Sequence, residues 1–164
     1  MIGVLALQGA VSEHRQMLTD IGAPNREVRQ AEDFKGLSGL IIPGGESTTL
    51  EKLMRRFGLD VALSAAIEEG LAVWGTCAGM ILLAQEITNG IPGQTGLGHL
   101  PICVERNAFG RQVQSCETPL QFAPLGDEPF SAVFIRAPKV VHTTDDAVLG
   151  TSTKVSATFR GAEG

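Results

Sequence analysis

The chain has 164 residues, which is enough for one domain with a sizeable hydrophobic core. Hydrophobic residues make up 43% of it and charged residues 19%, a globular composition that excludes a disordered chain. The formal net charge is −5 and no lysine- or arginine-rich run occurs, so we expect no nucleic-acid partner. No segment approaches the ~18 apolar residues of a membrane span, and the apolar N-terminus is too short for a signal peptide, so we expect no membrane association.

The cysteine count indicates the cellular compartment. Three cysteines, Cys77, Cys103 and Cys116, cannot all pair with one another, and their spacing is not that of metal ligands. We therefore expect a reducing, cytoplasmic setting and no metal site.

Predicted strands and helices alternate over the first half of the chain. Strands are predicted over 2–7, over 27–29, within 36–45 and over 72–75, and helices over 10–22, 47–58 and 60–70. The first helix should bury Val11, Leu18 and Ile21 on one face and end at Gly22. The second should start at a capping box that Thr48 and Glu51 form.

This alternation predicts an α/β fold with a parallel sheet and helices on both of its faces. After about Gly90 the pattern changes. The Gly- and Pro-rich segment GIPGQTGLGHLP is predicted to be a loop, and short strands, some of them antiparallel, are predicted within ICVERNAFGRQVQSCETPL and SAVFIRAP.

The stretch AVWGTCAGMILLA, residues 72–84, carries the strongest chemical signal. An apolar strand enters Gly-Thr-Cys-Ala-Gly and an apolar helix follows, which is a cysteine form of the G-x-S-x-G nucleophile elbow. Gly75 and Gly79 fit this turn because a Cβ at either position would crowd it. The helix that follows should favour the thiolate of Cys77. A buried structural cysteine is the alternative, but it would not need the two glycines.

The segment PGGEST, residues 43–48, is a glycine-rich turn that leads into a helix. Its backbone N–H groups would suit an oxyanion, with one donor from Gly45 and another from Ala78. A phosphate loop or a simple turn are the alternatives, although neither G-x-x-x-x-G-K-[ST] nor G-x-G-x-x-G occurs. Gln8 also follows a predicted strand, so three distant segments should meet at one edge of the sheet. The combination predicts acyl transfer through a thioester.

Five segments together, VLALQGA, LIIPGGESTT, WGTCAGMILLA, ERNAFGRQV and VFIRAP, resemble the glutaminase subunits of pyridoxal 5'-phosphate synthase, which belong to the class I glutamine amidotransferases. The similarity runs from Ile2 to about Pro138. It implies a flavodoxin-like, doubly wound fold in a single domain over residues 1–164. It also implies hydrolysis of L-glutamine, release of ammonia to a partner synthase subunit of vitamin B6 biosynthesis, and no metal, nucleotide or prosthetic group.

The resemblance also implies roles for individual residues. Cys77 would be the nucleophile, and the substrate contacts would be Gly45, Glu46, Ser47, Arg106, Ile135 and Arg136. The two arginines are chemically suitable, because a guanidinium binds an α-carboxylate through two parallel hydrogen bonds. Gln8 and His14 would lie at the rim of the site or at the partner interface, and we expect His14 to face solvent or the partner.

The family's catalytic base is a His in a late His-x-Glu segment, which the sequence lacks. We expect the sequence to be a shortened form of an ordinary enzyme and, as it stands, a feeble glutaminase at best, since a positioned base is worth ~10²–10⁴ in rate. The alternatives are an impaired or inactive docking module of the same complex, and recruitment of His142 as the base. His99 and Glu163 offer no substitute. A redox or carbonyl sensor built on the same elbow is a further alternative.

Overall fold

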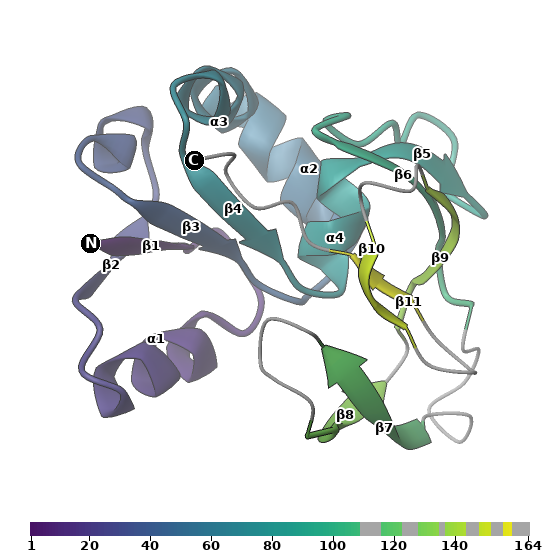
Figure 1. Cartoon of the computed structure of the whole chain (residues 1–164). Coiled ribbons are helices and arrows are strands. Elements are labelled where there is room, and N and C mark those ends of the chain that lie inside the picture. Colours follow the sequence, from purple (N-terminus) through teal and green to yellow (C-terminus); the bar gives the residue numbers. More distant parts are fainter. Residues whose placement is uncertain (109–115, 123–127, 135–136, 144–147, 152–155, 159–164) are drawn as a thin grey trace. The chain divides into compact units, whose positions relative to one another are not determined.

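The computed structural model describes residues 1–108, 116–122, 128–134, 137–143, 148–151 and 156–158. Its contacts divide the chain after Leu83, so that Met1–Leu83 and Ala84–Arg160 form two compact units. Figure 1 shows the elements of both. Each unit is described by itself below, and the prediction of a single domain stays a prediction.

A four-stranded parallel sheet forms the centre of the first unit. Its strands are β1 (Ile2–Leu5), β2 (Asn25–Val28), β3 (Gly39–Ile42) and β4 (Ala72–Gly75), and their order across the sheet is β2-β1-β3-β4. Every described pairing within this sheet is parallel. The chain thus starts in the middle of the sheet and winds outward in both directions, as doubly wound folds do.

Helices cover both faces of this sheet, as the alternating pattern predicted. The elements are α1 (Val11–Asp20), the short 3₁₀ helix η1 (Ala31–Phe34), α2 (Ser47–Arg56), α3 (Leu59–Glu68) and α4 (Ala78–Leu83). Helix α1 packs against β1 and β2, whereas α4 packs against β3 and β4, and α2 contacts both α3 and α4. Figure 1 shows α1 on one face of the sheet and α2, α3 and α4 on the other.

Two apolar clusters stabilise this arrangement. On the α1 face, Leu18 packs with Val4 and Ile41 of the sheet. On the other face, α2 and α3 bury four large side chains completely, namely Leu50, Met54, Leu59 and Leu63. Side chains of this size each contribute roughly 1.5–3 kcal/mol when fully removed from water. Packed apolar side chains on both faces therefore hold the sheet, including the edge where its strands end.

Two local predictions for these helices were wrong. Ile21 is 69% exposed rather than buried, because α1 ends at Asp20 and Gly22, at a φ of 72°, turns the chain away. Thr48 and Glu51 do not form a capping box. Glu46 caps α2 instead, and Glu51 is buried in an ion pair with Arg55 at 2.9 Å. A carboxylate one residue before the helix outcompeted the predicted threonine for the free N–H groups.

The second unit consists of strands in two small sheets. In one, β5 (Ala84–Thr88) pairs with β6 (Leu100–Glu105) in parallel, and β6 pairs with β9 (Lys139–Thr143) in antiparallel orientation. The other contains β7 (Cys116–Phe122), β8 (Phe130–Phe134), β10 (Val148–Thr151) and β11 (Ser156–Thr158), in the order β11-β10-β7-β8. The loop predicted for GIPGQTGLGHLP, residues 90–101, is confirmed as far as His99, but Leu100 and Pro101 already belong to β6, and the predicted antiparallel strands are confirmed. Among the described residues, no helix is long and apolar enough to cross a membrane.

Candidate active site

Cys77 occupies a strained turn between β4 and α4. Its φ is 49°, in the left-handed region that residues other than glycine seldom adopt. A Cβ on Gly75 would lie 2.5 Å from the backbone of Gly79, and a Cβ on Gly79 would lie 2.3 Å from the Ile42 carbonyl oxygen. The two glycines therefore let α4 approach the sheet closely. This geometry is that of a nucleophile elbow and agrees with the sequence pattern.

The Gly44–Gly45 turn lies beside the elbow and is bound to the end of β1. The N–H of Ala10 donates to the Gly44 carbonyl at 3.0 Å. Gln8 binds Glu46 at both ends of its amide, since Nε2 donates to the Glu46 carbonyl and Oε1 accepts from the Glu46 N–H, both at 3.2 Å. A Cβ on Gly44 would lie only 3.4 Å from the Cβ of Cys77. The three segments that the sequence predicted to converge do so within the first unit.

Two backbone N–H groups, those of Gly45 and Ala78, are hydrogen-bonded to the sulfur of Cys77. Burial raises the pKa of the thiol, while hydrogen bonds from the backbone of Ala78 and of Gly45 lower it, and burial prevails. These are the two groups predicted as oxyanion donors, and that role stays a prediction. The expectation that the helix would favour the thiolate is corrected, because α4 is only six residues long and the sulfur is largely withdrawn from water. The raised pKa disfavours the thiolate, which is the form of a cysteine that attacks a carbonyl carbon.

Glu46 and Ser47 stand at the start of α2. Burial raises the pKa of the Glu46 carboxyl, but hydrogen bonds from Thr48 and Thr49 outweigh it and lower that pKa to about 2. The carboxylate accepts the Thr49 N–H at 2.7 Å and the Thr48 N–H at 3.2 Å. Ser47 is buried. The Glu46 side chain is thus held by its own helix, while its backbone faces Gln8, and the substrate role predicted for both residues stays a prediction.

His14 was expected to face solvent or the partner, and within the first unit its side chain contacts the end of β4; a partner contact stays a prediction. Its ring is half-buried, with Nε2 at 3.4 Å from the Thr76 hydroxyl and the ring edge-on to Trp74 at 5.9 Å between centroids. Burial lowers the pKa of His14, although the Glu13 carboxylate acts in the opposite direction. The contact with the residue before Cys77 links α1 to the elbow. Sequence spacing could not have revealed this, because 62 residues separate the two partners.

The remaining predicted residues belong to the second unit. Arg106 is partly buried, with Nη1 of its guanidinium 3.4 Å from Gln94 Oε1, and its backbone N–H donates to the Thr88 carbonyl at 3.0 Å. Ile135 and Arg136 lie outside the described residues. His142 is exposed on β9, and His99 stands in the loop before β6. The glutamine contacts predicted for Arg106, Ile135 and Arg136 therefore stay predictions.

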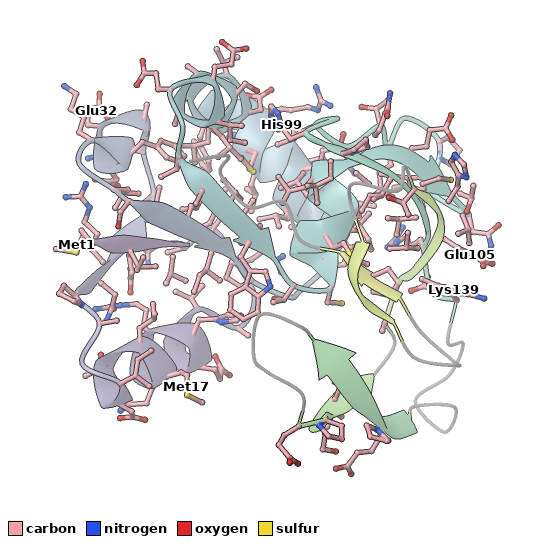
Figure 2. The ribbon with its side chains drawn as sticks, viewed as in Figure 1. Met1, Met17, Glu32, His99, Glu105 and Lys139 are labelled. Carbon is pink, nitrogen blue, oxygen red and sulfur yellow. The ribbon has the colours of Figure 1, made fainter. Side chains whose placement is uncertain are left out.

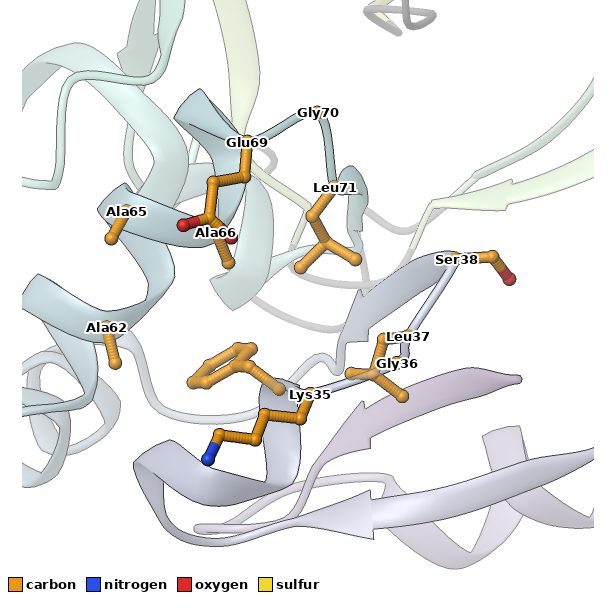
Figure 3. Close-up of a pocket in the computed structure, with 11 residues that line it drawn as sticks. Lys35, Gly36, Leu37, Ser38, Ala62, Ala65, Ala66, Glu69, Gly70 and Leu71 are labelled. Atoms are coloured by element: carbon orange, nitrogen blue, oxygen red, sulfur yellow. The ribbon is translucent and has the colours of Figure 1, made fainter.

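Cavities in the first unit lie at both edges of the sheet. One of about 300 Å³ is lined by Lys35, Ser38, Glu69 and Leu71 among others, and Figure 3 shows these side chains. Ser38 and Leu71 directly precede β3 and β4, so this cavity is at the edge opposite Cys77. A second, of about 430 Å³, extends from Gly9 along α1. Among the described residues, no group of His, Cys, Asp and Glu is arranged to hold a metal ion.

Comparison with known proteins identifies relatives over most of the chain. Residues 4–159 match the SNO glutamine amidotransferase family. A pyridoxal 5'-phosphate synthase subunit PdxT from Clavibacter sepedonicus is 55% identical over 140 residues, which cover 85% of this chain and 67% of the relative. The PdxT subunit of Deinococcus radiodurans is 57% identical over 144 residues, covering 86% and 73% respectively.

A solved structure shares the fold. It is described as the crystal structure of glutamine amidotransferase, is 47% identical in sequence, and superposes with a TM-score of 0.88 over 98% of this chain and 84% of that one. The flavodoxin-like, doubly wound fold that the resemblance implied is thereby confirmed, and with it the family on which the sequence prediction rested.

Proposed function

Because the chain belongs to the SNO glutamine amidotransferase family, we propose that it hydrolyses L-glutamine as the glutaminase subunit of a pyridoxal 5'-phosphate synthase. One observation carries the proposal at the level of atoms. Cys77 stands in a strained elbow with the backbone N–H groups of Gly45 and Ala78 directed at its sulfur. A nucleophile beside two fixed donors is the minimum that acyl transfer requires.

The reaction would proceed through a thioester. The thiolate of Cys77 attacks the γ-carboxamide carbon of glutamine, and the S–C bond forms while the carbonyl oxygen takes the negative charge. The N–H groups of Gly45 and Ala78 would stabilise that oxyanion, and one such donor is typically worth about 10²–10³ in rate. The C–N bond then breaks, and the proton that the Cys77 thiol released passes to the leaving nitrogen, so that it departs as ammonia. Water finally hydrolyses the thioester to glutamate and restores the thiol.

The predicted substrate contacts come from several segments of the chain. The turn from Gly45 to Ser47 would lie along the glutamine side chain, Arg106 and Arg136 would bind its α-carboxylate, and Ile135 would be a further contact. No metal, nucleotide or prosthetic group enters this scheme. The ammonia would pass to the synthase subunit, so that docking would be part of the mechanism, in a cytoplasmic complex.

A second candidate is an impaired docking module of the same complex, and the state of the sulfur favours it. Burial raises the pKa of Cys77, and His14, the one histidine in residues 1–83, is directed at Thr76. In this candidate the thiol depends on a base from outside residues 1–83. If neither the second unit, through His142, nor the synthase supplies one, the chain would bind its partner and react with glutamine only slowly.

Ammonia release from glutamine separates the two candidates. The chain is assayed alone and with a pyridoxal 5'-phosphate synthase subunit, beside a Cys77→Ala variant and a His142→Ala variant. Turnover that Cys77→Ala abolishes supports the glutaminase. No turnover, combined with covalent labelling of Cys77 by a chloroketone analogue of glutamine, supports the docking module. Failure of both turnover and labelling, with an intact fold, overturns glutamine as the substrate.

A further inference from the structure

The side chains of Trp74 and Thr76 form a short polar and aromatic surface at the end of β4, and His14 covers it. Residues two apart along an extended strand point to the same face, so both side chains face α1. His14 reaches the two together, with Nε2 at 3.4 Å from Thr76 Oγ1 and its ring edge-on to the indole at an interplanar angle of 78°. Such edge-to-face contacts are favourable beyond the area that they bury.

Thr76 is held on its backbone as well. Its N–H donates to the Ile42 carbonyl at 3.0 Å, and its carbonyl accepts the Gly79 N–H at 2.9 Å in the first turn of α4. These bonds fix the residue along the strand direction. The hydroxyl contact with His14 fixes it from the side of α1, immediately before the strained φ of Cys77.

Helix α1, which carries His14, is also hydrogen-bonded to the Gly44–Gly45 turn. The N–H of Ala10, at the start of α1, donates to the Gly44 carbonyl, and the N–H of His14 is directed back at the Ala10 carbonyl at 3.4 Å. A Cβ placed on Gly44 would lie 3.9 Å from Thr76 Oγ1, so the hydroxyl stands beside that turn. The first residues of α1 therefore contact both the Gly44–Gly45 turn and the Cys77 elbow.

We propose that His14 is a positioning residue that acts through the Thr76 hydroxyl to hold the Cys77 elbow in register with the Gly44–Gly45 turn. This inference rests on the proposed function for its biological meaning, but its geometry is independent of the substrate. A neutral imidazole can either donate to the hydroxyl or accept from it, whereas an imidazolium can only donate. Burial favours the neutral ring and Glu13, its neighbour on α1, favours the charged one.

A double-mutant cycle tests the coupling. His14→Gln and Thr76→Val are made separately and together, and the rate of Cys77 alkylation is followed on its peptide by mass spectrometry. Two reagents are used in parallel, iodoacetamide and a chloroketone analogue of glutamine. Each single variant should change the rate about fivefold, which is the factor that one net neutral hydrogen bond supplies, and the double variant should change it no further.

Additive effects in the cycle, or an unchanged rate in His14→Gln, would overturn the proposal. Met17→Ala is the matched control on α1, because Met17 is 64% exposed and points away from the unit (Figure 2), and it should leave both rates unchanged. If the two substitutions are coupled towards iodoacetamide but Cys77 does not react with the chloroketone, the proposed function is contradicted and the role of His14 is supported. If Cys77 reacts with both reagents but the effects are additive, the role of His14 is contradicted and the proposed function is supported.

A measurement on the unaltered chain covers the case in which the variants do not fold. Trp74 is the single tryptophan, and an imidazolium at its edge quenches indole fluorescence. Emission should fall with decreasing pH through a midpoint below the usual value for histidine, since burial lowers the pKa of His14. Carboxamidomethylation of Cys77 should shift that midpoint by about 0.3 pH units or more, a twofold change in the equilibrium. An unshifted midpoint contradicts the coupling.

Discussion

Gln8 binds the backbone of Glu46 from both sides, its Nε2 donating to the carbonyl and its Oε1 accepting the N–H, each at 3.2 Å. Thirty-eight residues separate the two partners in sequence. The pair joins the carboxyl end of β1 to the turn that carries Gly45. Because Gly45 directs its N–H at the sulfur of Cys77, the position of one oxyanion donor depends on an amide side chain two strands away from the nucleophile.

Replacement of Gln8 by alanine should therefore weaken the site more than the fold. Both bonds are solvent-exposed, so the loss of stability should be about 1 kcal/mol or less. Labelling of Cys77 by the glutamine chloroketone should slow about tenfold, because a displaced donor stabilises the oxyanion poorly. Gln16→Ala, an exposed amide on α1 that bonds Asp20, serves as the control. Equal labelling rates in the two variants would contradict this role of Gln8.

The cap of α2 should make stability depend on pH through Glu46. The folded-state pKa of its carboxyl is lowered to about 2 from its ordinary value of 4.5, so its contribution is fully present above about pH 4.5 and is lost as the pH falls towards 2. Glu46→Gln should cost about 1 kcal/mol at pH 7, a typical value for a helix cap, and less at pH 3. Urea unfolding at the two pH values measures this.

Glu68→Gln is the matched control for that experiment. Glu68 is an exposed carboxylate at the carboxyl end of α3, where a negative charge is slightly unfavourable. Its replacement should leave the free energy of unfolding unchanged or slightly raise it. A pH-independent cost for Glu46→Gln would show that the cap does not act through its charge.

The reactivity of Cys77 should follow a raised pKa. Since burial outweighs the two backbone hydrogen bonds, the rate of alkylation by iodoacetamide should still be rising above pH 9, the ordinary value for a thiol. The chain with Cys77→Ser gives the background from the other cysteines. A plateau reached below pH 8 would mean that a nearby cation or base stabilises the thiolate.

The close approach of α4 to the sheet predicts unequal effects of two similar substitutions. Gly79→Ala would place a Cβ 2.3 Å from the Ile42 carbonyl oxygen, and the resulting shift should cost about 1–3 kcal/mol and reduce labelling of Cys77. In Gly39→Ala the new Cβ would lie 3.3 Å from the flexible tip of Ile2 and 3.7 Å from the Ala72 carbonyl oxygen, an ordinary contact distance, so the cost should be less than about 1 kcal/mol. Urea midpoints of the two variants compare them directly. Similar costs for both would contradict the steric account of the elbow.

Local chemistry made much of the first unit predictable. Apolar strands, amphipathic helices and stopping glycines such as Gly22 and Gly70 act over a few residues, so their pattern can be recognised in the sequence alone. The wrong predictions concern the ends of helices, where neighbouring residues compete for the same role. Glu46 rather than Thr48 caps α2, because its carboxylate reaches two free N–H groups. Ile21 is exposed because α1 ends at Asp20, the residue before it.

What the sequence determined by itself was the candidate nucleophile, the two glycine-rich turns and the alternating α/β pattern, because each depends on residue types at fixed short spacings. The tertiary structure decided how these parts act on one another. Only packing could raise the pKa of Cys77, since burial opposes the hydrogen bonds of Gly45 and Ala78. Only packing could bring His14 to Thr76 and Gln8 to Glu46, since parallel strands place residues far apart in sequence at one edge of a sheet.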